Sequence, residues 1–381
     1  METERRRFFI NGLLFVLTFI TTTLSGTEWA YGKSIFFTDF TWSDFKSGMQ
    51  FSIPFLLILT VHEFGHYFTA MYHKVRSSLP YYIPIPPIFL SIGTLGAIIR
   101  IRSKVYSNIQ HFDIGLAGPL SGFIIAFFVL YYGFITLPPP EYIFQFHPEY
   151  EQYGLNYADH VYSAEYLKDK SVLDVQFGSN LLFVFFQKFV ADPSRVPNPH
   201  ELMHYPVLMA GFIALFFTSL NLLPIGQLDG GHVVYGLFGR KGHDIIAAVF
   251  FILLLIYSGL GYADIHADKE QLSWLVPLGV LFYFICLQGL GLPILETLMY
   301  ALLIVVFLLG MAWFFPNVKG YSGWLFFGLL VGRLLGVRHP PSEIEQPLDT
   351  RRQILGWICL LIFILSFSPQ PLILTEFNLA K

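Results

Sequence analysis

Long apolar runs separated by short polar segments dominate the hydrophobic pattern of the chain. A membrane-spanning helix needs about 20 mostly apolar residues. About nine stretches come close to that length, and one of them is short enough to be a tilted or re-entrant segment. The pattern therefore predicts an all-α polytopic membrane protein with about nine transmembrane helices. These lie at residues 8–24, 51–73, 113–136, 206–226, 245–262, 273–292, 296–315, 322–336 (the short one) and 354–374.

Two longer segments interrupt this pattern. Segment 74–112 contains a β-branched run around Gly93 and Gly96, which predicts a small membrane-associated β-hairpin. Segment 138–205 is aromatic and acidic, and its apolar patch 181–190 is too short to span a bilayer. We expect that patch to lie on the membrane surface.

Composition agrees with a membrane protein and excludes other classes. Hydrophobic residues make up 54% of the chain and charged residues only 13%, against about 25% charged in a soluble domain. The net charge of -3 and the lack of a long basic tract argue against nucleic acid as a partner. Cys286 and Cys359 lie far apart in apolar runs, so neither a disulfide framework nor a cysteine metal site is indicated.

The distribution of basic residues predicts the orientation. Fourteen of the 23 Lys and Arg residues fall in segments on the same side as the N-terminus, which places the N-terminus in the cytoplasm. The charged start METERRR precedes a weak cleavage region, so we expect an uncleaved anchor. With no targeting segment evident, a prokaryotic plasma membrane is the expected location.

The stretch VHEFGHY contains two histidines and a glutamate, and it lies inside the second apolar run. His62 and His66 are four residues apart and share one helix face, while Glu63 is turned about 100° from His62. This HExxH pattern predicts two imidazole ligands for Zn²⁺ and a glutamate that acts as general base for water. The alternative is a polar pore lining or helix interface, but ionisable groups inside a membrane are costly and usually functional.

A catalytic zinc usually takes three protein ligands. His73 lies about 10 Å along the helix axis from His66, which is too far to share an ion. The extended HExxHxxGxxH pattern fails because Thr69 and Tyr72 occupy its last two positions. Glu296, at the start of a later apolar run, is one candidate for the third ligand. Its position is equally consistent with capping that helix or with facing a polar crevice.

The strongest candidate for the third ligand lies in NLLPIGQLDGGH, residues 221–232. Pro224 and the glycines break the helix, and broken backbone at membrane depth is tolerated where it lines a cavity or is buried in protein. Asp229 would be presented on this unwound stretch. The alternative is that Asp-Gly-Gly is only the turn that ends a helix, and His232 is left as a capping or supporting group.

Together these residues resemble the site-2 protease family of intramembrane zinc metalloproteases. The resemblance covers about 51–232: HEFGH on one span, a connecting span, then the NxxPxxxxDG arrangement. It implies Zn²⁺ as cofactor and a hairpin at 83–102 that pairs with an unwound substrate strand. It also implies these roles: zinc ligands His62, His66 and Asp229, catalytic base Glu63, and substrate-binding residue Asn221.

The chain departs from the family in two places. Gly122 stands where many members have the Asn of a GPxxN motif, so this position offers no polar side chain. Segment 138–205 stands where many members have a PDZ domain, but it is too short and irregular for one. The expected organisation is an anchor helix and outer loop (1–50), a protease core (51–232) and additional C-terminal transmembrane helices (233–381) without a recognised motif.

The expected function is hydrolysis of peptide bonds in membrane-embedded proteins. By resemblance, the partners are the lipid bilayer and single-span membrane substrates of regulated intramembrane proteolysis. One rival is a transporter that uses the same His, Glu and Asp side chains as an ion or proton relay, although no internal repeat supports it. Others are a non-catalytic scaffold and a different zincin that uses Glu296.

Overall fold

In the computed structural model of the chain, residues 2–88, 90–168, 172–261 and 269–377 are described. Parts of five predicted segments lie outside these residues: 1 in the N-terminal segment, 89 in the hairpin loop, 169–171 in the outer loop, 262 at the end of the fifth span, and 262–268 and 378–381 in the C-terminal part. The described elements are mostly helices, as predicted, and two small two-stranded sheets accompany them. Among the described residues, five helices are long and apolar enough to cross a membrane, so the count of nine is not confirmed.

The chain divides into two compact units. The first contains residues 1–104, 117–220 and 361–381, and the second contains 105–116 and 221–360.

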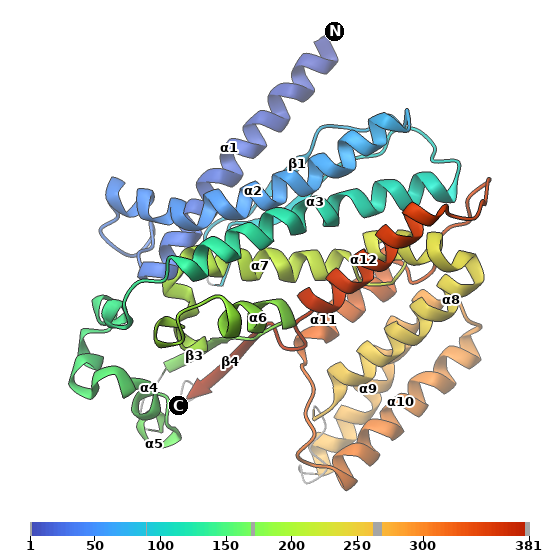
Figure 1. The fold of residues 1–381 in the computed structure, drawn as a ribbon. Coiled ribbons are helices and arrows are strands. Elements are labelled where there is room, and N and C mark those ends of the chain that lie inside the picture. The colour runs from blue at the N-terminus through green and yellow to red at the C-terminus, as the bar shows by residue number, and fades with distance from the viewer. Residues whose placement is uncertain (1, 89, 169–171, 262–268, 378–381) are drawn as a thin grey trace. The chain divides into compact units, whose positions relative to one another are not determined.

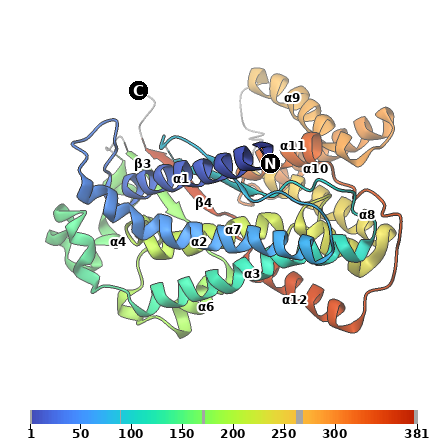
Figure 2. The ribbon, with the colours of Figure 1, turned by 90° about the horizontal axis from the view of Figure 1, so that it is seen from above.

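In the first unit, helices α1 (Glu2–Tyr31) and α2 (Trp42–Tyr72) pack side by side (Figures 1 and 2). They approach closely where a Cβ on Gly48 would lie 2.1 Å from the carbonyl oxygen of Thr23. The helix α2 begins well before the predicted residue 51. The reason is a capping box, in which the Thr41 amide donates to Asp44 and the Asp44 amide donates to the Thr41 hydroxyl, and a hydropathy pattern does not register such a polar first turn.

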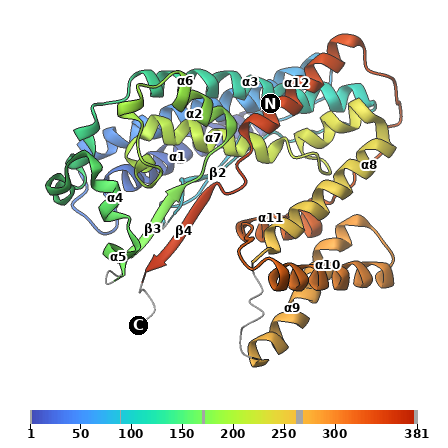
Figure 3. The same cartoon turned by 60° about the horizontal axis from the view of Figure 1, so that its bottom comes forward.

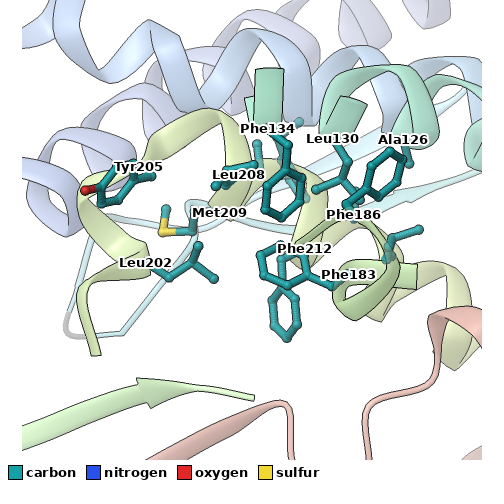
Figure 4. Packing of buried hydrophobic residues seen from close by; sticks show 14 of the residues in the cluster. Ala126, Leu130, Phe134, Phe183, Phe186, Leu202, Tyr205, Leu208, Met209 and Phe212 are labelled. Atoms are coloured by element: carbon teal, nitrogen blue, oxygen red, sulfur yellow. The ribbon is translucent and has the colours of Figure 1, made fainter. Parts of the chain in front are cut away.

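The core of this unit lies between α3 (Asn108–Ile135), α6 (Leu181–Phe189) and α7 (Pro206–Asn221), as Figure 4 shows. The rings of Phe134 and Phe186 stack there at 5.7 Å. Helix α6 is the predicted short apolar patch. It buries Phe186 and leaves Phe185 and Phe189 exposed, and its location at the membrane surface stays a prediction.

The predicted hairpin is confirmed as β1 (Tyr81–Pro84) paired antiparallel with β2 (Thr94–Ile98). Two contacts place it within the first unit. The Thr21 hydroxyl of α1 donates to the Gly93 carbonyl at 2.6 Å, and the Thr60 hydroxyl of α2 lies 2.8 Å from the Tyr82 hydroxyl. Gly93 has φ +82 and a Cβ there would meet the backbone of Thr21, so only glycine fits.

A second sheet was not predicted. Strand β3 (Val172–Phe177) pairs antiparallel with β4 (Leu372–Phe377), with Phe177 opposite Leu372 (Figure 3). The prediction that the ninth span reaches residue 374 is therefore wrong at its end. Helix α12 (Thr350–Ser366) stops earlier, before Pro369 and Pro371, which cannot donate the hydrogen bonds that a continuing helix needs.

The rest of the outer loop is irregular, as expected. It consists of short helical turns: η1 (Pro140–Gln145), η2 (Pro148–Asn156), α4 (Tyr157–Val161), α5 (Ala164–Leu167), η3 (Pro193–Arg195) and η4 (Pro199–His204).

The second unit is helical. Helix α8 (Asp229–Gly259) is kinked at Gly239, whose φ is +67. It packs against α11 (Gly323–Leu330), while α9 (Lys269–Leu287) packs against α10 (Ile294–Phe314), as Figure 3 shows. The predicted eighth span corresponds to α11 and the π-helical turn Val331–Leu335 after it, followed by Gly336.

Candidate metal centre

The two histidines of HEFGH converge inside the first unit. They lie one turn apart on α2, with exposed fractions of 5% for His62 and 7% for His66. Their Nε2 atoms are 3.0 Å apart. Two nitrogen ligands at about 2.0–2.1 Å from one tetrahedral ion are separated by about 3.3 Å. The pair therefore fits the donor set of a shared zinc ion.

Glu63 lies beside this pair. Its Oε1 atom is 4.0 Å from the Nε2 atom of His62, and the residue is 5% exposed. The carboxylate is thus close enough to accept a proton from a water molecule held near the imidazoles. This is the geometry predicted from the helical period.

Glycines on α3 make room for the two imidazoles. A Cβ on Gly118 would lie 2.1 Å from His66 Nε2, and a Cβ on Gly122 would lie 3.0 Å from the Cβ of His62. The Ser121 hydroxyl, between them in sequence, donates to the Val61 carbonyl at 3.1 Å. Gly122 therefore packs closely against His62 of α2, where a larger side chain would meet that residue. Residue-type reasoning missed Gly118, although small residues four apart are a known signal for close helix packing.

The predicted break between the two helices is confirmed, but the predicted place of Asp229 is wrong. Asp229 does not lie on the unwound stretch, and Asp-Gly-Gly does not end a helix, because this residue is the first of α8. Helix α7 ends at Asn221 and α8 starts at Asp229, with non-helical backbone between them. A Cβ on Gly230 would lie 2.0 Å from the Leu222 carbonyl oxygen, so the chain folds tightly back on itself. Asp229 is half-buried at the start of α8, where the helix dipole favours a carboxylate. Its role as a zinc ligand, and that of Asn221 in substrate binding, remain predictions.

The other candidates have different surroundings. Glu296 is exposed in the first turn of α10, a position that suits interaction with the helix dipole. His73 is the residue that ends α2.

His232 belongs to a hydrogen-bonded chain of histidines in the second unit that the sequence did not indicate. His339 Nδ1 donates to the Pro340 carbonyl at 2.6 Å, so His339 Nε2 accepts from His232 Nδ1 at 2.7 Å. The ring of His111 stacks on that of His232 at 5.1 Å. His232 thus links the first turn of α8 to His339, and its role as a capping or supporting group for the metal centre stays a prediction.

Comparison with known proteins supports zinc as the cofactor. The model of Peptidase family M50 matches residues 50–257. The "Probable zinc metalloprotease EGY1, chloroplastic" of Oryza sativa subsp. japonica is 28% identical over 65% of this chain and 40% of its own length. The protein of the same name in Arabidopsis thaliana is 28% identical over 52% of this chain and 31% of its own length.

The "Probable zinc metalloprotease EGY2, chloroplastic" of Oryza sativa subsp. indica is 27% identical over 55% of this chain and 33% of its own length. The chain thus spans two fifths or less of these relatives. No solved structure matches it. Because the family model covers more than half of the chain and includes the buried HEFGH pair, the chain belongs to peptidase family M50, the site-2 protease family of membrane zinc metallopeptidases.

Proposed function

We propose that this chain is an intramembrane zinc metalloendopeptidase that hydrolyses peptide bonds of membrane-embedded proteins. The observation that carries the proposal is the buried pair of Nε2 atoms 3.0 Å apart on a helix within the region matched by the family model. When bound there, zinc supplies Lewis-acid chemistry, polarising a water molecule or a carbonyl group. The family match does not favour the ion or proton relay.

The proposed ligands are His62, His66 and Asp229. Two imidazoles and one carboxylate form a familiar donor set for catalytic zinc and leave a position open. The family arrangement of HEFGH and LDG supports this set. In the proposed topology, both motifs lie near the same side of the membrane.

Glu63 is the proposed general base. Its carboxylate takes a proton from water and later passes a proton to the leaving amine. Its burial near His62 supports this role because a dry environment strengthens the electrostatic interactions of a carboxylate. Asn221 is proposed to hold the substrate backbone near the scissile bond.

Strand β2 is the proposed platform for an unwound substrate. In the described part of the chain it pairs with β1 alone within its sheet, which suits addition of an extended peptide. The Tyr82–Thr60 contact ties this sheet to α2 just before HEFGH, so an added strand would lie close to the metal-binding helix.

The finer assignments are proposals as well. The substrates are single-span proteins, and about nine helices span the bilayer, with the N-terminus in the cytoplasm of a prokaryotic cell. A chloroplast membrane is the competing location, since the relatives above are named chloroplastic. The proposed parts are the anchor 1–50, the core 51–232 and the C-terminal helices 233–381.

The test compares wild type with Glu63→Gln in detergent, using a fluorogenic casein as a general protease probe and metal analysis in parallel. Loss of the general base should lower turnover by about 10²–10⁴-fold while zinc is retained. Glu270→Gln, which changes an exposed glutamate of α9, is the matched control and should leave turnover unchanged. Undiminished cleavage by Glu63→Gln would contradict the mechanism, and a wild type that binds no zinc at HEFGH would favour the relay.

A further inference from the structure

A second group of potential metal ligands lies in the outer loop of the first unit, far in sequence from HEFGH. It consists of His147 at the start of η2, and Glu201 and His204 on η4. The Nε2 atoms of the two histidines are 3.2 Å apart. Glu201 Oε2 lies 3.8 Å from His147 Nε2 and 3.6 Å from His204 Nε2.

Hydrogen bonds on the far side of each ring fix which nitrogen carries the proton. His204 Nδ1 lies 2.7 Å from the Ala30 carbonyl oxygen, which can only accept, so Nδ1 donates. His147 Nδ1 lies 3.2 Å from the Glu149 carboxylate and donates to it in the same way. In their neutral forms, both rings therefore turn an Nε2 lone pair toward the other. A carbonyl or carboxylate behind the ring is the usual arrangement for histidines that bind metals.

The third donor, Glu201, is also held in one orientation. Glu201 Oε1 accepts a hydrogen bond from the Tyr162 hydroxyl, which leaves Oε2 facing the two imidazoles. Glu201 is 1% exposed and His204 is 8% exposed.

Three electron-pair donors that face one another repel unless a metal ion or a proton lies between them. Their separations of 3.2, 3.6 and 3.8 Å are close to the about 3.3 Å between ligands of a tetrahedral zinc ion. The His232–His339 contact differs, because an N–H group lies between those two nitrogens and accounts for their 2.7 Å separation.

We propose that His147, Glu201 and His204 form a second zinc site, separate from the HEFGH centre, in the outer loop. The metal joins η2 to η4, and through the His204–Ala30 hydrogen bond it fixes both turns to the end of α1. The His147 ring is the most exposed of the three side chains, at 28%, and lines a groove of about 1440 Å³ together with Tyr31 and Phe146. A fourth ligand, such as water, can approach from that groove.

Zinc analysis of the full chain in detergent tests this proposal, with two pairs of substitutions. His62→Ala with His66→Ala removes the HEFGH ligands, and His147→Ala with Glu201→Gln removes the outer ligands. We expect about two zinc ions per wild-type chain, about one for either double variant and none for the quadruple variant. The control is His160→Ala, which removes an exposed histidine of the same loop and should leave the count unchanged.

Occupancy by Co²⁺ provides a second readout. Cobalt added to the His62→Ala/His66→Ala protein should give the visible absorption of a tetrahedral ion, and His147→Gln should weaken it while disturbing the loop less than alanine. A chelator should also increase proteolysis between residues 147 and 166 of the His62→Ala/His66→Ala protein, because it removes the metal that joins η2 to η4. It should have no such effect when the outer ligands are replaced as well. If HEFGH does not bind zinc, the variant with the outer ligands replaced should contain no zinc. That result is distinct from failure of the outer site.

The proposal is overturned if the wild type holds about one zinc that disappears with His62→Ala/His66→Ala, and cobalt gives no absorption in that variant. The outer cluster would then hold a proton shared between the two rings instead of a metal.

Discussion

His62 Nε2 lies 3.0 Å from His66 Nε2, although the two residues are separated by a full helical turn. Both side chains must lean toward the same point for this contact to form. Since both rings are buried and lie against glycines of α3, removing either imidazole would leave a cavity beside that helix.

Replacing His66 with Ala should therefore abolish zinc binding at this centre. A single imidazole and a carboxylate do not hold a structurally defined zinc ion, since catalytic sites use three protein ligands. The measurement is zinc content in the His147→Ala/Glu201→Gln background, where the outer ligands cannot contribute. His73→Ala, at the end of α2, is the control and should retain zinc. Retention of zinc by His66→Ala would contradict the proposal that His62 and His66 bind one zinc ion together.

Gly118→Ala should disturb the same centre from the neighbouring helix. The added Cβ would lie 2.1 Å from His66 Nε2, so either the imidazole or α3 must move. We expect zinc affinity to fall by about 10–100-fold, as when groups that orient a ligand are altered. We also expect a loss of about 1–3 kcal/mol in the free energy of unfolding from overpacking. Competition with a fluorescent zinc chelator and thermal melting measure the two effects.

Gly310→Ala is the matched control for that substitution. It also changes a glycine of an apolar helix, α10, but a Cβ there would meet no atom within 4 Å. It should leave zinc affinity unchanged. If both variants lose zinc equally, the effect of Gly118→Ala comes from a general property of glycine in these helices rather than from contact with His66.

Local periodicity predicted the parts of this centre that lie within one element. The 3.6-residue period alone places His62, Glu63 and His66 correctly on α2, and the β-branched run around Gly93 predicts β2. Pro224 and the glycines after it likewise predict the break between α7 and α8. In each case, the information that fixes the structure lies within a few residues.

Features that depend on distant partners were not predictable. β3 and β4 are separated by most of the C-terminal half of the chain, and no local pattern pairs Phe177 with Leu372. The outer cluster was missed for the same reason, because His147 lies far from Glu201 and His204 without a motif spacing. Span ends were misplaced where polar capping or proline decided them, as at Thr41 and Pro369.

Asp229→Asn should remove zinc from the core centre if the proposed ligand set is correct. Asn has nearly the shape of Asp and is well tolerated near helix starts, so α8 should still form. It lacks the negative charge that helps to bind the cation. The comparison variant is Glu296→Gln, which should keep zinc. If Glu296→Gln loses zinc and Asp229→Asn keeps it, the ligand set of another zincin type applies.

Arg352→Ala should destabilise the second unit without removing zinc. The Arg352 guanidinium donates from Nε and Nη2 to the two carboxylate oxygens of Asp113, each at 2.8 Å, and from Nη1 to Asp349. Such a bidentate pair joins the starts of α3 and α12, and the side chains are only 29% and 16% exposed for Arg352 and Asp113. Because solvent screens the pair in part, we expect a loss of about 1–2 kcal/mol in the free energy of unfolding.

Thermal melting in detergent measures this loss, and two further variants identify its cause. Arg352→Lys keeps the charge but loses the planar fork, so it should recover only part of the stability. Arg351→Ala removes the exposed neighbouring arginine and should change the melting temperature little. A double variant of Arg352→Ala with Asp113→Asn should be less destabilised than the sum of the single changes, since both remove the same interaction. Strict additivity would mean that the two side chains stabilise the unit independently.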